Sequence, residues 1–252
     1  MKFGYAISNK EDLFPEIEFA KKHFGFVEIN LKQELSMYTP GHISEIREVL
    51  DGFQVIGHLL RSFASSEKDK EKLNFICETI KILNEIGAKK IVIHPSDNVR
   101  ALCEASDACA KKGQQLLIEN SKRGPFSRAN VLESLVKQVR GSAIAFDVGH
   151  ALMASGHEME RFLGLENRIK HVHLHDCESG LDHLAFTDKK KLGGIMEKVR
   201  KTGYDDTVTL EAFFVLKDGK RIETEGQEKR KMLLQQLGLL GHRSLLSTKH
   251  NI

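Results

Sequence analysis

The sequence has few cysteines and prolines and no long apolar run. Its four cysteines form neither a CxxC pair nor a zinc-ribbon spacing, and dispersed cysteines of this kind are typical of a reducing compartment. The four prolines mark no linker between domains. Because no stretch of about 18 apolar residues occurs, we expect no transmembrane helix. The first residues show no signal-peptide pattern either, so a cytoplasmic protein without membrane contact is expected.

An excess of charge of one sign is also missing. The 38 Lys and Arg residues nearly balance the 35 Asp and Glu residues, and a formal net charge of +3 does not by itself indicate nucleic-acid binding. No GxGxxG or GxxxxGK[ST] motif follows a strand-like run, so the usual signal of an open-sheet nucleotide-binding fold is absent. With 40% hydrophobic and 29% charged residues, the composition is that of a globular protein.

Short apolar runs alternate with longer amphipathic ones from one end of the chain to the other. The predicted strands are 3–7, 26–31, 54–58, 90–94, 115–119, 143–147, 170–175 and 207–211. The predicted helices are 11–23, 42–50, 67–87, 98–112, 129–139, 157–163, 188–202 and 223–237. Strict alternation implies parallel strands joined by right-handed crossovers. Eight such units in a chain of this length predict an α/β protein with a single (β/α)8 TIM barrel. We expect this domain over residues 1–240 and a tail over 241–252.

Most of the predicted strands end in an acid or an imidazole. These residues are His58, His94, Glu119, Asp147, His171, His173, His175, Asp176 and Glu211, and His150 lies just beyond a strand. Burying an ionisable group without a partner costs several kcal/mol, so one shared site that holds a metal is the economical interpretation. The ends of barrel strands converge on one rim. The residues expected to face one another there are Glu119, Asp147, His173 and Glu211.

Three carboxylates and one imidazole make an oxygen-rich set of ligands. Such a set suits Mn²⁺ or Mg²⁺, and Zn²⁺ or Co²⁺ where the geometry is tighter. A second, more nitrogen-rich group that favours Zn²⁺ is expected from His58, His94, His150 and His183. Alternation places the three histidines of HVHLHD on one strand face, inside the barrel. His171 sits lowest there and is expected to be structural. A single residue of this kind at a strand end is more commonly a core residue or a salt-bridge partner than a metal ligand. The hypothesis of a metal site therefore depends on all the strand ends taken together.

The succession VIGH, IVIHPS, LIEN, FDVGHA, HVHLHD, DHL and TLEAF resembles the xylose-isomerase-like TIM-barrel superfamily over nearly the whole chain. Its members include sugar isomerases and epimerases and endonuclease-IV-type repair enzymes. The resemblance implies a divalent-metal-dependent isomerase or epimerase of a sugar or sugar phosphate, with one metal on the four ligands named above. Glu119 and Glu211 would be the acid and base that move a proton through a metal-stabilised enediolate. His150 and His183 would contact the substrate.

The alternative within the same superfamily is a zinc-dependent phosphodiesterase that cleaves DNA at abasic sites. That resemblance implies three zinc ions on nine ligands. Eight match here: His58, His94, Glu119, Asp147, His150, His173, His183 and Glu211. The ninth, an aspartate two residues before His183, is Leu181 in this chain, and Asp182 is one position away. Arg61 and Phe63 are candidates to probe a duplex, although an ordinary loop is the simpler interpretation. A related lyase or dehydratase, or a non-catalytic barrel, are further alternatives.

The expected substrate contacts differ from those of the sugar epimerases. No arginine follows the last histidine of HVHLHD, where CESG stands instead, and the glycine-rich turn after His183 is replaced by HLAFTDKKK. Lys122 and Arg123 follow Glu119 closely and would lie on the rim. They are candidates to bind a substrate phosphate, with a solvated loop as the equal alternative.

Overall fold

A computed structural model describes residues 1–7, 12–31, 35–59 and 69–241. Eight parallel strands form a closed barrel in the order β1-β10-β7-β6-β5-β4-β3-β2. The barrel strands are β1 (Lys2–Ile7), β2 (Phe26–Leu31), β3 (Gln54–Leu59), β4 (Lys90–Ile93), β5 (Gln115–Glu119), β6 (Ala143–Asp147), β7 (Ile169–Leu174) and β10 (Thr207–Leu210). The prediction of a single (β/α)8 barrel is therefore confirmed.

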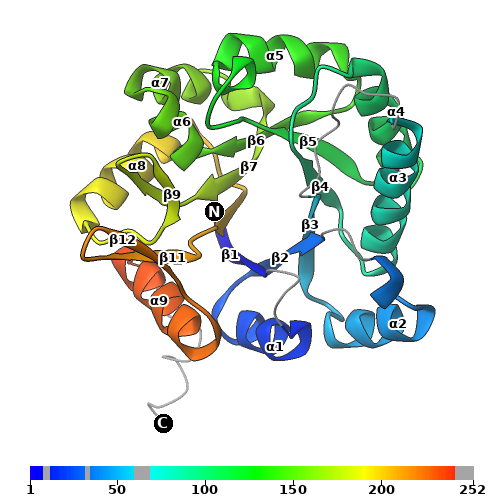
Figure 1. Ribbon diagram of the computed structural model, residues 1–252, viewed down its shortest axis with the longest axis horizontal. Helices are drawn as coiled ribbons and strands as arrows, with labels where there is room; N and C mark the ends of the chain where they lie inside the picture. Colours follow the sequence, from blue (N-terminus) through cyan, green and yellow to red (C-terminus); the bar gives the residue numbers. More distant parts are fainter. Residues whose placement is uncertain (8–11, 32–34, 60–68, 242–252) are drawn as a thin grey trace.

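The helices surround the barrel, as Figure 1 shows. They are α1 (Leu13–His23), α2 (Pro40–Val49), α3 (Asp69–Glu85), α4 (Val99–Ala110), α5 (Ala129–Gln138), α6 (Val148–Ala154), α7 (Gly156–Leu163), α8 (Lys189–Lys201) and α9 (Gly226–Leu239). Short 3-10 turns occur at η1 (Leu35–Met37), η2 (Pro125–Ser127) and η3 (Glu166–Arg168). Several helices begin at a side-chain cap: Asn98 accepts from the N–H of Ala101, and Asp188 from that of Lys190. In the described part of the chain, none of the helices has the length and apolarity that crossing a membrane requires.

Some predicted boundaries are wrong. The strands were expected to include His94, His175 and Glu211, and each of these residues lies one position beyond the end of its strand. The predicted helix 223–237 begins too early, because Glu223 belongs to a strand. Helix α6 was not predicted. Arg61, Phe63 and nearly all of the predicted tail over 241–252 lie outside the described residues.

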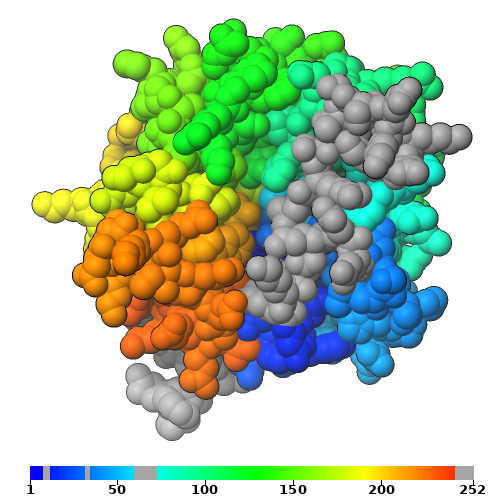
Figure 2. All heavy atoms as spheres, in the orientation of Figure 1, coloured from blue at the N-terminus to red at the C-terminus, as the bar shows by residue number. Residues whose placement is uncertain are grey.

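A second, smaller sheet was not predicted at all. It has the order β12-β11-β9-β8 and consists of β8 (Asp176–Glu178), β9 (Leu181–Leu184), β11 (Phe214–Lys217) and β12 (Lys220–Glu223). Its segments follow β7 and β10, so the sheet stands beside the C-terminal ends of these barrel strands. The orange segment that contains β11 and β12 lies at the surface of this face of the molecule (Figure 2). The barrel mouth is therefore walled on one side by this sheet.

The barrel interior changes from apolar to polar along the strands. A small apolar cluster fills its lower part: Phe26, Ile56, Val92, Leu117, Ala143 and Ala145. Gly4 makes room for it, because a Cβ at that position would lie 2.5 Å from the ring of Phe26. Two residues further along a strand the same face carries a polar group, as in Ile56 and His58 or Leu117 and Glu119. The site is built on this upper, polar layer.

Candidate metal centre and active site

Three carboxylates converge on one nitrogen of His173. Its Nδ1 lies 2.6 Å from Oε1 of Glu119, 3.0 Å from Oε2 of Glu211 and 3.9 Å from Oδ2 of Asp147. All four side chains are buried, with relative exposures of 3% or less. One imidazole nitrogen carries at most one proton, so it cannot satisfy three carboxylates at once. An additional cation at this point would offset the remaining negative charge.

The unsatisfied atoms of the site also fit a bound cation. Oε2 of Glu211 and Nε2 of His58 are buried and make no hydrogen bond within the described residues. Leaving such atoms unpaired costs about 1–3 kcal/mol each. Glu119, Asp147, His173 and Glu211 each offer a ligand atom within 4.8 Å of the others. The donor set of three carboxylates and an imidazole therefore fits a divalent cation.

Further groups of possible ligands adjoin this one. They are His58, His94 and Glu119; Glu28, His58, His173 and Glu211; and His150, His175 and His183. The structure thus places every metal ligand expected from the sequence in at least one such group. Glu119 belongs to two of them, because its Oε2 lies 3.2 Å from Nε2 of His94. A carboxylate in that position can bridge two ions.

Glu28 is the main residue that the sequence analysis missed. It is fully buried in β2, and its carboxylate contacts Nδ1 of His58 at 2.9 Å and Nε2 of His173 at 3.1 Å. It also contacts Nε2 of His171 at 2.9 Å. A carboxylate that accepts the Nε2 proton of His173 leaves Nδ1 free to face a metal. The sequence FVEIN did contain a signal, because Glu28 shares the inward face of the strand with Phe26. Glu28 lies in the middle of the strand, however, and the strand-end pattern does not include it.

His171 lies deepest of the three histidines on β7. Its Nδ1 lies 2.8 Å from Oγ1 of Thr207, and its Nε2 contacts Glu28. With both nitrogens engaged away from the cavity, it supports the polar layer from below.

A cavity of about 770 Å³ opens above the buried layer. Its lining includes Asn30, His58, His94, Glu119, Lys122, Arg123, His150, Asp182, His183, Glu211 and Phe214. At the cavity wall, Asp182 forms ion pairs with two basic side chains. Its carboxylate lies 2.6 Å from Nζ of Lys122 and 3.0 Å from Nη1 of Arg221. The guanidinium of Arg221 stacks 4.0 Å from the ring centre of Phe214. The cavity therefore combines a buried anionic floor with a cationic wall.

The family described as xylose isomerase-like TIM barrel matches residues 17–233. The chain belongs to this family. Its membership confirms the resemblance seen in the strand-end motifs.

Similar proteins cover most of this member of the xylose isomerase-like family. An uncharacterized protein of Methanocaldococcus jannaschii is 21% identical over 213 residues, which are 76% of this chain and 84% of that protein. Among solved structures, D-psicose 3-epimerase of Clostridium cellulolyticum H10 has a TM-score of 0.74 and 18% identity, with 96% and 97% of the two chains covered. Endonuclease IV of Thermus thermophilus has a TM-score of 0.67 and 18% identity, with 96% and 99% covered. At these identities the two structures show a shared fold.

Electrostatics in this xylose isomerase-like barrel hold the site ionised. Burial alone would raise the pKa of Glu119, but the charge of His173 and hydrogen bonds with His173 and His94 hold it well below its usual range. The pKa of Glu28 is lowered in the same way, against its burial, by His173, His171 and His58. Burial would lower the pKa of His173, yet Glu28, Glu211 and Glu119 raise it well above 6.5. A cation that enters must therefore displace a proton from His173.

The metal-free protein is expected to lose stability at both ends of the pH range. The pKa values of Glu28 and Glu119 are lowered on folding. Their contribution to the free energy of unfolding is therefore present above pH 4.5 and is lost as the pH falls further. The pKa of His173 is raised, so its contribution is present below 6.5 and lost as the pH rises through the raised value. Urea midpoints of chelated protein between about pH 3 and 9 measure this dependence. Loading with Mn²⁺ should remove the alkaline loss, and an unchanged midpoint on acidification would contradict the ion-paired arrangement.

Proposed function

We propose that this chain is a divalent-metal-dependent isomerase or epimerase of a sugar or a sugar phosphate. The observation that carries the proposal is the pair Glu119 and Glu211 on the cavity floor, within 2.6 and 3.0 Å of the same nitrogen of His173. They come from β5 and from the end of β10, which are separated in the barrel by β6 and β7. Two carboxylates that approach one point from different strands suit removal and return of a proton at one substrate carbon.

The residues that would hold the metal are Glu119, Asp147, His173 and Glu211. When bound, a divalent cation would supply a Lewis acid that polarises a substrate carbonyl. Oε2 of Glu211, which is buried without a hydrogen bond among the described residues, would accept the proton from carbon. Glu119 faces the same point from the other side; because its pKa is held low, it would first take up a proton from solvent and then donate that proton to the carbon.

The upper cavity would bind the rest of the substrate. His150 and His183 line it and would contact hydroxyl groups. Lys122 and Arg123 stand at the wall, and Lys122 is already positioned by Asp182. A phosphate there would share the cations with Asp182 and would add charge-assisted hydrogen bonds. The structural similarity to an enzyme named D-psicose 3-epimerase supports a ketose as the first substrate to test.

A second candidate function is zinc-dependent cleavage of DNA at abasic sites. Two histidine-rich groups beside the four-residue group favour this function, because they could hold additional ions. They are His58, His94 and Glu119, and His150, His175 and His183. The similarity to endonuclease IV supports the same candidate. In that case the metals would activate water and stabilise the leaving oxygen.

One assay separates the two functions. Chelated protein is reloaded with Mn²⁺, Co²⁺ or Zn²⁺ and offered D-psicose, D-tagatose, D-fructose, L-ribulose and ketose phosphates in deuterated water, and in parallel a duplex that contains an abasic site. We expect metal-dependent interconversion of a ketose with deuterium incorporation, and intact DNA. A lower KM for the phosphorylated ketose would support the role of Lys122 and Arg123. Cleavage of the abasic duplex without sugar turnover would overturn the proposal in favour of the nuclease.

A further inference from the structure

Two buried asparagines line the cavity, and they differ in how their amides are satisfied. Asn30 is 2% exposed and Asn120 is fully buried. The amide of Asn120 is engaged at both ends: its Nδ2 donates to the carbonyl oxygen of Asp147 at 2.9 Å, and its Oδ1 accepts from the backbone N–H of the same residue at 2.7 Å. Asn120 therefore connects the end of β5 to the end of β6 and has a structural role.

Asn30 has no such partner for its amide oxygen. Its Oδ1 is buried and makes no hydrogen bond in the part of the chain that the structure describes. Most buried polar atoms in proteins are hydrogen-bonded, so each exception needs an explanation. An amide oxygen only accepts hydrogen bonds. The partner that fits it is therefore a donor from a molecule in the cavity.

The position of Asn30 follows from the alternation along β2. Phe26, Glu28 and Asn30 share the inward face of this strand at three successive heights. Phe26 belongs to the apolar cluster in the lower barrel, and Glu28 holds the imidazoles of the polar layer above it. Asn30 lies one step higher and pairs in register with His58 of β3. Its amide therefore reaches the cavity above the ion-paired layer.

The surroundings of Asn30 suit an uncharged donor. The amide itself carries no charge. The carboxylate of Glu28 below it is already shared by three imidazoles and by the hydroxyl of Thr209. No charge is left at this side of the cavity for an ammonium group to offset. A hydroxyl group is the donor that matches these conditions.

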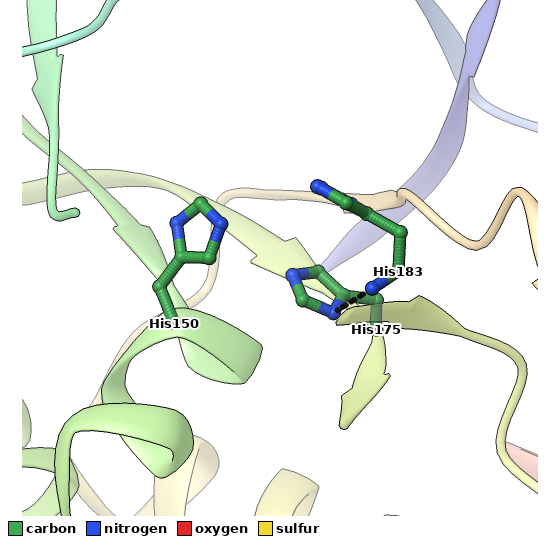
Figure 3. A group of neighbouring side chains, drawn as sticks. All are labelled: His150, His175 and His183. Carbon is green, nitrogen blue, oxygen red and sulfur yellow. Dashed lines mark hydrogen bonds between the residues drawn. The ribbon is translucent and has the colours of Figure 1, made fainter. Parts of the chain in front are cut away.

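The other groups expected to bind substrate lie across the cavity from Asn30. In the closed order of the barrel, β2 and β6 stand opposite each other, four strands apart in either direction. His150 follows β6 on α6, and Figure 3 shows it beside His183. Asp182 holds Lys122 at the same side. A substrate whose phosphate meets Lys122 therefore directs its other end toward Asn30.

We propose that Asn30 accepts a hydrogen bond from the hydroxyl at the end of the substrate remote from its phosphate. In a ketose that carries a phosphate on its last carbon, this is the hydroxyl on C1. The inference rests on the proposed function and narrows its substrate class to ketose phosphates with a free C1 hydroxyl. A site built to accept from a hydroxyl discriminates against the analogue that lacks it, because the buried acceptor is then left unpaired.

The test compares two ligands that differ only in this hydroxyl, D-xylulose 5-phosphate and 1-deoxy-D-xylulose 5-phosphate. Their dissociation constants are measured by calorimetry on full-length protein loaded with Mn²⁺. We expect the parent protein to bind the first about 10- to 100-fold more tightly. Asn30→Ala should bring the ratio close to one, whereas Asn30→Asp, which keeps an acceptor oxygen in place, should retain the preference. Asn167→Ala, at an exposed position in η3, is the matched control and should show the parent ratio.

Unfolding in urea without any sugar separates a binding role from a structural one. Because Oδ1 of Asn30 makes no hydrogen bond within the described residues, the midpoint of Asn30→Ala should stay close to that of the parent. Asn120→Ala loses two hydrogen bonds to Asp147 and should unfold at a lower urea concentration. An equal loss of stability in both variants would show that Asn30 supports the fold, and would overturn the inference.

The binding results also distinguish this inference from the proposed function. Equal affinity of the parent for the two ligands, no binding of either, or an unchanged ratio in Asn30→Ala would overturn the role of Asn30. Turnover of a ketose in the same protein would leave the proposed function standing. A preference that depends on Asn30, in a protein that exchanges no substrate proton, would support this inference and overturn the proposed proton transfer alone.

Discussion

The Glu211→Gln variant is expected to lose exchange of the substrate proton with solvent. Burial would raise the pKa of Glu211, but the charge of His173 lowers it, so the carboxylate is ionised at neutral pH and able to accept a proton. Glutamine keeps the shape and the oxygen ligand but cannot take up a proton. General base catalysis contributes about 10²- to 10⁴-fold, so turnover should fall by at least that factor.

The measurement is the incorporation of deuterium from solvent into the ketose on which the parent protein acts, with metal content determined on the same sample. Glu178→Gln, at the exposed end of β8, is the matched control and should exchange at the parent rate. Exchange at an unchanged rate in Glu211→Gln, with the metal still bound, would exclude the two-glutamate mechanism.

Replacing Glu28 by glutamine is expected to reduce both stability and metal affinity. The carboxylate holds three buried imidazoles, those of His58, His171 and His173, and Thr209 donates to it at 2.7 Å. Removing one partner of a buried ion pair typically costs about 3–5 kcal/mol. Because Glu28 also orients His173, metal affinity should fall by about 10- to 100-fold. Urea unfolding of chelated protein and competition with a metal-sensitive dye measure the two effects separately.

Glu16 offers a control that separates these effects. It is buried in α1, where Oε1 lies 2.7 Å from Nη2 of Arg230 and Oε2 accepts from the hydroxyl of Tyr5 at 2.6 Å. Glu16→Gln should therefore lower stability and leave metal affinity unchanged. A Glu28→Gln protein that loses stability alone would show that Glu28 supports the barrel and does not position a metal ligand.

The fold was predictable because its signals are local and repeated. Eight apolar runs of strand length alternate with amphipathic segments, and each of the eight predicted barrel strands is present. Helix α6 was missed because it has only seven residues and follows β6 directly, with Asp147 as its cap. The strands β8, β9, β11 and β12 were missed because they have three or four residues each. The pairs β8–β9 and β11–β12 are short hairpins, and the single contact that joins them, between Leu184 and Phe214, is distant in sequence. Elements this short show no clear period.

The candidate site was predictable only where a polar residue ended a strand. Glu119, Asp147 and His173 stood out because each interrupts or ends an apolar run. Glu28 carried the same kind of signal within FVEIN, but a single acid in mid-strand does not reveal its partners. The ion pair of Asp182 with Lys122 carried no local signal, since its two residues are 60 positions apart.

The sequence by itself determined the alternation of elements and the types of residue that reach the rim, because periodicity and strand-end chemistry are properties of neighbouring residues. Only the tertiary structure decided which groups share a partner. Closing the barrel brings Glu28 to His173 across 145 positions, and the small sheet brings His183 to His150 and His175. Which nitrogen of each imidazole is left for a metal depends on these contacts, because the tautomer is set by the carboxylate or carbonyl on its other side.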